Sequence, residues 1–147
     1  MSLCYNERKK GGDMMEYVVS GGVLAVPEGV KRLGFGDICR YVQAHTVREI
    51  LLPSTLEIIE ADAFFDLTEL QKINIPGRVT KIGSQAFWGL DGLWELMVPD
   101  TVACIEKHAF CNMPHCRIVI VGQSLCIPDG WDAEFASNVQ EICFASA

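Results

Sequence analysis

Two histidines and two cysteines lie close together late in the chain, in the pattern H-x₂-C-x₃-H-C formed by His108, Cys111, His115 and Cys116. A further thiol, Cys104, precedes them. Imidazole and thiolate groups at such short spacing are ligands that zinc prefers. The pattern therefore raises the hypothesis of a zinc site, which competes with the simpler interpretation that these side chains only pack.

A longer pattern in the chain favours packing. A segment of 23 residues occurs three times in succession, beginning at Val47, Leu70 and Leu93. In this register Cys116 takes the first position of a further copy, where Leu70 and Leu93 stand, and a buried cysteine acts as a small hydrophobic residue. We therefore expect no metal site and no cofactor.

Other motifs for enzyme chemistry are missing from the sequence. It has no glycine-rich phosphate loop, no G-x-S-x-G and no H-E-x-x-H. The acidic residues Asp62, Asp66 and Asp91 fall in turn segments between apolar positions, where carboxylates are simply solvated. The sequence predicts no catalytic residues and a protein that is not an enzyme.

Each 23-residue unit has a physical interpretation. Its fourth and sixth positions are apolar, as in Ile73 and Ile75, and this period of two predicts a short strand with one buried face. The proline at position 7 lacks an N–H and ends the strand. Apolar residues at positions 10 and 13 turn back to the same core, and Ala-Phe at positions 17 and 18 with Leu at 21 predicts one short helical turn. A period of this length is typical of a solenoid.

The consensus L-x-x-I-x-I-P-x-x-V-x-x-I-x-x-x-A-F-x-x-L-x-x closely resembles the bacterial leucine-rich repeats of the Bacteroides surface-antigen type, called BspA-like or treponemal. The resemblance covers roughly residues 21–121. It implies a right-handed repeat solenoid of short parallel β-strands with turns and short helical segments, capped at both ends. It also implies a surface-exposed protein that binds other proteins and has no catalytic site.

The repeat divides the chain into four parts. We expect a flexible tail over residues 1–16 and an N-terminal cap with an irregular first repeat over 17–46. The three regular repeats occupy 47–115, and a last strand with a C-terminal cap occupies 116–147. In that cap, Trp131 and Phe135 predict a short amphipathic helix, and a final strand is expected from Val139 to Phe144.

Composition narrows the partners and the compartment. The 147 residues carry a formal net charge of −7, which argues against nucleic acid and anionic membranes as partners. No apolar segment is long enough for membrane insertion. Seven unevenly spaced cysteines indicate reduced thiols, and the polar first ten residues do not resemble a signal peptide. The sequence therefore predicts a cytoplasmic protein; the alternative is a cell-surface or secreted protein whose export signal precedes this segment.

The outward positions of the predicted strands supply the candidate binding residues. One row alternates in charge and another is mainly apolar, and exposed apolar rows bordered by charge mark interaction surfaces. An alternative is that the end segments cover part of this face. The candidates for the strand face are Arg48, Glu49, Leu51, Lys72, Asn74, Trp94, Glu95, Met97, Ile118 and Ile120.

A second row follows each Ala-Phe pair and contains Phe65 and Trp88. These side chains are a candidate lateral contact, for example in a homodimer, or they stack between coils. The sequence as a whole predicts a non-enzymatic module that presents its strand face to a protein partner. The alternative is a self-associating structural protein that uses the same apolar rows to form a homo-oligomer.

Overall fold

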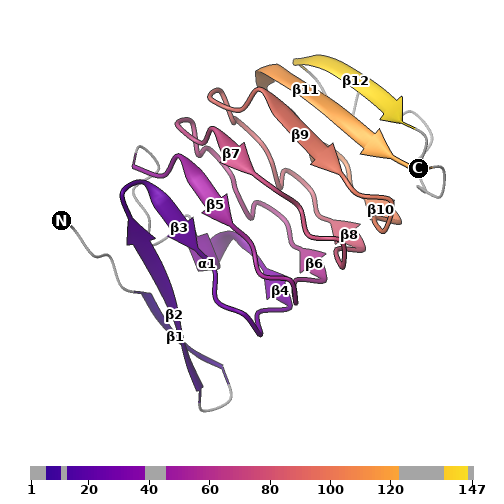
Figure 1. Ribbon diagram of the computed structural model, residues 1–147. Coiled ribbons are helices and arrows are strands. Elements are labelled where there is room, and N and C mark those ends of the chain that lie inside the picture. The colour runs from indigo at the N-terminus through magenta and orange to yellow at the C-terminus, as the bar shows by residue number, and fades with distance from the viewer. Residues whose placement is uncertain (1–5, 11–12, 39–45, 123–137, 146–147) are drawn as a thin grey trace.

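Successive coils of the chain stack into a solenoid in which equivalent strands lie side by side (Figure 1). The computed structural model describes residues 6–10, 13–38, 46–122 and 138–145. Each regular coil contributes one strand to each of two faces, and the apolar side chains between these faces form one continuous core. The repeat predicted from the sequence is therefore a solenoid repeat.

The first strand of each coil forms the face that we call the strand face. Its parallel members pair in two groups, from β3 to β7 with Glu49 opposite Lys72, and from β9 to β12 with Arg117 opposite Glu95. Inward positions such as Ile50 and Leu96 are buried, as the period of two predicted. The strands are β3 (Val23–Ala25), β5 (Glu49–Leu51), β7 (Lys72–Ile73), β9 (Glu95–Val98), β11 (Met113–Val121) and β12 (Val139–Ala145).

A second parallel sheet, which the sequence analysis did not predict, runs along the other side of the solenoid (Figure 1). Its strands are only two residues long, too short for a period of two to be visible in the sequence. Each ends at the buried apolar residue of position 13, for example Ile59 or Ile82. The strands are β4 (Arg32–Leu33), β6 (Ile58–Ile59), β8 (Lys81–Ile82) and β10 (Cys104–Ile105).

The predicted helical turn at each Ala-Phe segment is a single hydrogen-bonded turn, in which the Phe65 and Trp88 N–H groups donate to the Asp62 and Gln85 carbonyls, and it does not extend into a helix. The residue just before Ala-Phe has a positive φ in each repeat, at Asp62, Gln85 and His108, with values of 56°, 55° and 59°. A left-handed residue interrupts a right-handed helix. Other backbone groups of these turns bond across coils, because the Phe64 and Phe87 N–H groups donate to the Ala86 and Ala109 carbonyls, both at 2.9 Å.

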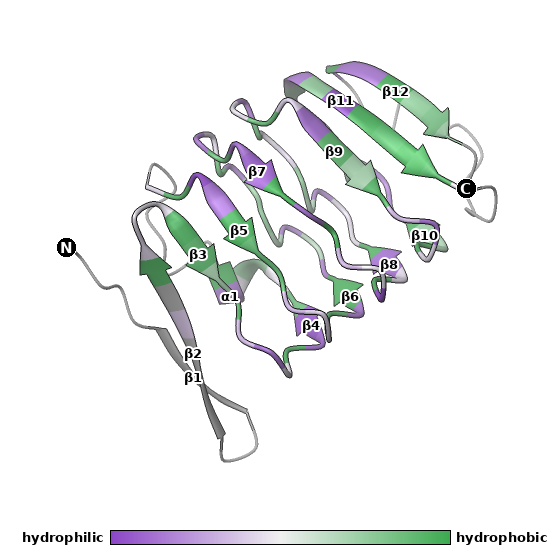
Figure 2. Ribbon diagram, viewed as in Figure 1, coloured by the Kyte–Doolittle hydropathy of each residue, from purple (hydrophilic) through white to green (hydrophobic). Residues whose placement is uncertain are grey.

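The three phenylalanines of these turns form a column through the core. Phe64, Phe87 and Phe110 are fully buried, and their ring centroids are 5.2 and 5.5 Å apart. Figure 2 shows hydrophobic and hydrophilic residues alternating along the stack: β3 and most of β11 are green, whereas β4, β7 and β8 contain purple segments. The side chains from neighbouring coils bury one another, which no single coil achieves alone.

The N-terminal end differs from the expected tail. Strands β1 (Asn6–Lys10) and β2 (Asp13–Ser20) pair antiparallel, and β2 pairs antiparallel with β3. Main-chain pairing needs no apolar pattern, so the polar sequence hid this hairpin. Helix α1 (Phe35–Ile38) is the one helix among the described residues, and no described helix is long and apolar enough to cross a bilayer.

At the C-terminal end, β12 pairs parallel with β11. It is the final strand that the sequence predicts from Val139 to Phe144. The expected helix with Trp131 and Phe135 lies outside the described residues. Strand β11 is not in the expected register, because Arg117 pairs with Glu95 across 22 residues instead of 23. The chain becomes extended already at Met113, and an extended residue advances about 3.3 Å, so one residue fewer reaches the paired position.

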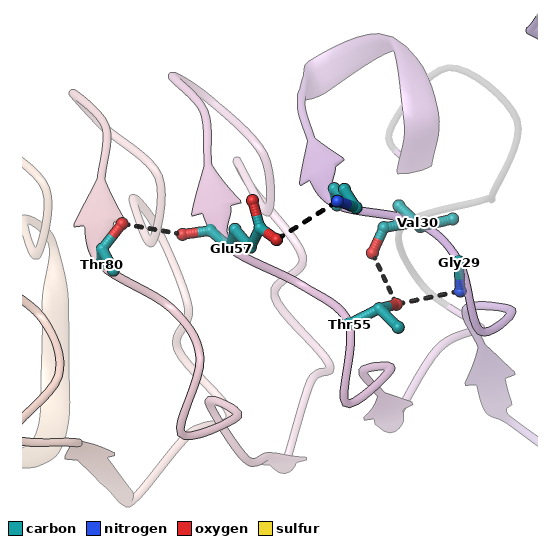
Figure 3. Close-up of polar contacts among 6 residues, drawn as sticks. Gly29, Val30, Thr55, Glu57 and Thr80 are labelled. Atoms are coloured by element: carbon teal, nitrogen blue, oxygen red, sulfur yellow. Dashed lines mark hydrogen bonds and ion pairs between the residues drawn. The ribbon is translucent and has the colours of Figure 1, made fainter.

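Polar contacts also link the coils at the turn that follows the strand face. The Thr55 hydroxyl donates to the Val30 carbonyl at 3.0 Å and accepts from the Gly29 N–H at 2.9 Å (Figure 3). The Thr80 hydroxyl lies 3.3 Å from the Glu57 carbonyl in the next pair of coils (Figure 3). The Glu57 carbonyl also accepts from the Thr80 N–H at 2.9 Å, so side-chain and main-chain bonds together link these coils.

Candidate functional site

The strand face presents large side chains to solvent. Trp94 is 67% exposed, Met97 56% and Leu51 48%. They lie at outward positions of successive strands, whereas their inward neighbours are buried. Eight of the ten predicted face residues are exposed or half-exposed, so the described end segments do not cover this face: Arg48, Glu49, Leu51, Lys72, Asn74, Trp94, Glu95 and Met97.

The other two predicted residues are wrong. Ile118 and Ile120 are fully buried, because the shift of one residue in β11 turns them inward opposite Leu96 and Val98. A slip of one residue exchanges the two faces of a strand. The outward positions of β11 belong instead to Arg117 and to the half-buried Val119.

A row of charged residues crosses the face in two separate groups. The Lys72 ammonium lies 2.7 Å from the Glu49 carboxylate in the first group. In the second, the Arg117 guanidinium lies 3.8 Å from Glu95 and 3.2 Å from Glu141 on β12. A hydrogen bond with Cys143 and the two carboxylates raise the pKa of Arg117. Among the described residues, Lys72 and Glu95 form no ion pair with each other, although the repeat places them in one row.

The two groups are separated because the sheet itself is divided. The ladder from β1 ends at β7, and a separate ladder joins β9, β11 and β12. The same two coils stay joined elsewhere, since β8 pairs with β10 and Phe87 stacks on Phe110. The main chain of β7 therefore has a ladder partner on the β5 side and none on the β9 side. We call this division the β7–β9 break.

A groove lies along the β7–β9 break. It is open to solvent and has a volume of about 490 Å³, within the range of about 300–1,000 Å³ that ligand pockets span. Apolar groups form most of its surface, and among the described lining residues Asp100 is the one that carries a charge and Asn74 the one with a side-chain amide. The lining residues are Asn74, Ile75, Met97, Pro99, Asp100 and Val121.

The sequence analysis identified only Asn74 and Met97 among these lining residues. The repeat pattern assigns Ile75 to the core and Pro99 to the turn that ends the strand. No local pattern distinguishes them, because the groove depends on where two coils separate. The alternating charges did contain a signal for the register of β11, since only the 22-residue spacing places Arg117 between Glu95 and Glu141.

The histidines and cysteines of the zinc hypothesis do not lie together in one site. Cys111 and Cys116 are fully buried, as the packing interpretation expects, whereas Cys104 is exposed. The His115 ring stacks on Trp94 with centroids 5.5 Å apart. Burial, with a smaller contribution from Glu95, raises the pKa of the Cys116 thiol to about 12. In the described part of the chain, no three His, Cys, Asp or Glu side chains are arranged to hold a metal ion.

The candidate lateral residues contact each other. The rings of Phe65 and Trp88 are stacked with centroids 6.3 Å apart, and both side chains are half-buried. Cys111, the next residue in that row, is buried. A second, smaller groove beside them is lined by Phe35, Asp62, Phe65 and Gln85.

The repeat and its geometry match a known family. A model of the BspA type leucine rich repeat region matches residues 40–130 with six copies, and the chain belongs to this family. The resemblance deduced from the Pro and Ala-Phe positions is therefore confirmed. A comparison with curated proteins finds no match.

Solved structures from bacteria share the fold. The pneumococcal vaccine antigen PcpA superposes with a TM-score of 0.70 at 25% identity, over 86% of this chain and 31% of that chain. A leucine rich cell surface protein from Faecalibacterium prausnitzii also gives a TM-score of 0.70, at 20% identity, over 98% of this chain and 40% of that chain. The present chain thus spans less than half the length of either solved chain.

Proposed function

We propose that this protein is a non-enzymatic module that binds a protein partner through its strand face. The observation that carries the proposal is the row of exposed Leu51, Trp94 and Met97, bordered by Glu49, Lys72 and other charged side chains. Tryptophan is enriched where binding energy is concentrated, and exposed apolar groups surrounded by charge mark interfaces. Membership of a leucine-rich repeat family supports an interaction role.

The electrostatics of the face support binding rather than catalysis. Its carboxylates at Glu49, Glu95 and Glu141 each lie beside a basic side chain. A neutralised charge loses less hydration when a partner covers it than an isolated charge does. Such a face can fix orientation through its ion pairs while the apolar side chains contribute affinity.

Selection of peptide binders tests this proposal. A random peptide library is panned against the wild-type protein, and the enriched peptides are then measured against the Trp94→Lys, Met97→Glu double variant. We expect the variant to fold normally and to lose at least about tenfold in affinity, since each site removes an exposed anchor. Peptides that bind both proteins equally would contradict a role for this face.

Self-association through the same rows is the second candidate, and the exposed apolar area supports it as well. Light scattering on a size-exclusion column measures it directly for the wild type and the double variant. A wild-type dimer with a folded monomeric variant would assign the face to self-association. Two monomers of equal stability would leave the face free for a different partner.

A further inference from the structure

The β7–β9 break gives the strand face one place that differs from the rest. From β3 to β7, neighbouring coils pair both at the strand face and at the second sheet. Here the two coils remain together at β8 and β10 but are not paired at the face. The groove of about 490 Å³ lies on this break, so a side chain from outside can enter between two coils.

The walls of the groove determine which side chain fits. Met97 is 56% exposed, and with Ile75, Pro99 and Val121 it surrounds the space with aliphatic groups. These groups offer no hydrogen-bond partner, so they favour an apolar side chain of the ligand. Burying such a side chain removes apolar surface of both molecules from water.

The polar groups of the groove constrain the ligand further. The Asn74 side chain carries both a donor and an acceptor, which match the acceptor and donor of a peptide main chain. Asn74 is exposed, so its side chain can bond to the main chain of an extended segment. Asp100 is exposed and is the charged residue among the described lining residues, which gives the groove a negative end.

We infer that the β7–β9 break is a docking groove for an extended peptide segment of a partner protein, in which an aliphatic side chain is followed by a basic one. The aliphatic side chain enters between Ile75 and Met97, and the basic group pairs with Asp100. This inference rests on the proposed binding function of the strand face and specifies its site and its ligand chemistry.

Three short synthetic peptides test the chemistry. They share one extended sequence and differ at two central positions, which are leucine–arginine, leucine–glutamate or alanine–arginine. We expect the leucine–arginine peptide to bind about tenfold tighter than either of the others, because each change removes one anchoring contact. Amide chemical shifts in NMR titrations report affinity and location, and the largest changes are expected at Asn74, Met97 and Asp100.

Matched variants separate the groove from the rest of the face. Met97→Ala truncates a groove side chain, and Leu51→Ala truncates a similarly exposed residue of the same row on β5, outside the groove. We expect Met97→Ala to weaken binding of the leucine–arginine peptide about tenfold and Leu51→Ala to weaken it much less, because Leu51 contributes to the face but does not line the groove. Asp100→Asn should remove the preference for arginine over glutamate.

The outcomes distinguish this inference from the proposed function. Equal losses in Met97→Ala and Leu51→Ala would overturn the groove while supporting the face as a whole. No selective binding by any of the three peptides would also overturn the groove, and the library selection would still decide the function of the face. Weaker binding in Met97→Ala alone, with loss of charge preference in Asp100→Asn, would establish the groove.

Discussion

The two coils that contain β7 and β9 are joined by strand pairing on one side of the solenoid, which we call the closed side. On the other side, the open side, their strands do not pair. On the closed side, β8 pairs with β10 and the Lys81 ammonium contacts the Glu106 carboxylate. On the open side, β7 and β9 do not pair, and a groove lies between them. Two ladders built from the same repeat thus differ at one pair of coils, so the repeat sets where strands lie but not whether every pair closes.

The buried phenylalanine column packs between the two faces of the solenoid. We expect its loss to have the largest effect on the free energy of unfolding. Phe87→Ala removes the ring that stacks on Phe64 in the preceding coil and on Phe110 across the β7–β9 break. We expect a loss of about 3–5 kcal/mol in the free energy of unfolding, because a buried ring leaves a cavity. Urea denaturation measures this loss. The control is Trp88→Ala at a half-buried neighbour, which should lower the free energy of unfolding by less. An unchanged midpoint for Phe87→Ala would reject the assignment of this column as the main core.

Substitutions at two glycines allow the closed sheet to be compared with the open groove. A Cβ at Gly83 would lie 2.5 Å from the Ala61 nitrogen in the closed sheet, whereas a Cβ at Gly77, just after the groove residue Ile75, meets nothing within 4 Å. We expect Gly83→Ala to cost about 1–3 kcal/mol because the coils must separate, and Gly77→Ala to be neutral or slightly stabilising. Thermal denaturation of both variants measures this difference. Equal melting temperatures would show that the closed sheet tolerates separation as well as the open side does.

The buried thiol on β11 makes the open side sensitive to high pH. The pKa of Cys116 is raised from 9.0 to about 12 in the folded protein, so above pH 9 the unfolded chain loses a proton that the folded chain keeps. Stability should therefore fall as pH rises from about 9 towards 12, by up to about 1.4 kcal/mol per pH unit from this group. Urea denaturation under reducing conditions at pH 8 to 10 measures the slope. Cys116→Val should reduce it, and an identical slope in the two proteins would contradict the burial of this thiol.

The smallest expected effect compares two charge pairs that join the same two coils. Lys81 and Glu106 are in contact on the closed side, where their hydrogen bond lowers the pKa of Glu106, while Lys72 and Glu95 occupy the same repeat position in the two coils on either side of the break. Double-mutant cycles with Met in place of Lys and Gln in place of Glu should give a coupling of about 0.2–1 kcal/mol for the first pair. The second pair should give a coupling near zero. Equal couplings would mean that the break closes in solution.

Much of the strand face could be predicted from the sequence because its alternation is local. A period of two puts Leu51 and Met97 outside and Ile50 and Leu96 inside whatever the partner coil does. The same reasoning placed Ile118 on the wrong face, since a period of two says nothing about a missing residue between strands. The register of β11 is set by pairing with β9, which is a contact between distant residues.

The groove could not be predicted, because none of its lining residues departs from the repeat in a way that indicates separation. Pro99 occupies the position that is proline in each of the three regular repeats, and Ile75 occupies an inward-facing position of the repeat. They line a groove only because β7 and β9 do not pair, while contacts on the opposite side hold the two coils together. Whether two strands pair therefore depends on contacts throughout the stack and not on the sequence of one repeat.

The sequence by itself determined the repeat, the family, the buried Ala-Phe column and most of the exposed face, since these depend on spacing and hydrophobicity within each unit. Tertiary structure alone decided the second sheet, the register of β11, the N-terminal hairpin and the β7–β9 break. These features depend on main-chain hydrogen bonds between coils, and every residue type except proline offers the same donor and acceptor for them.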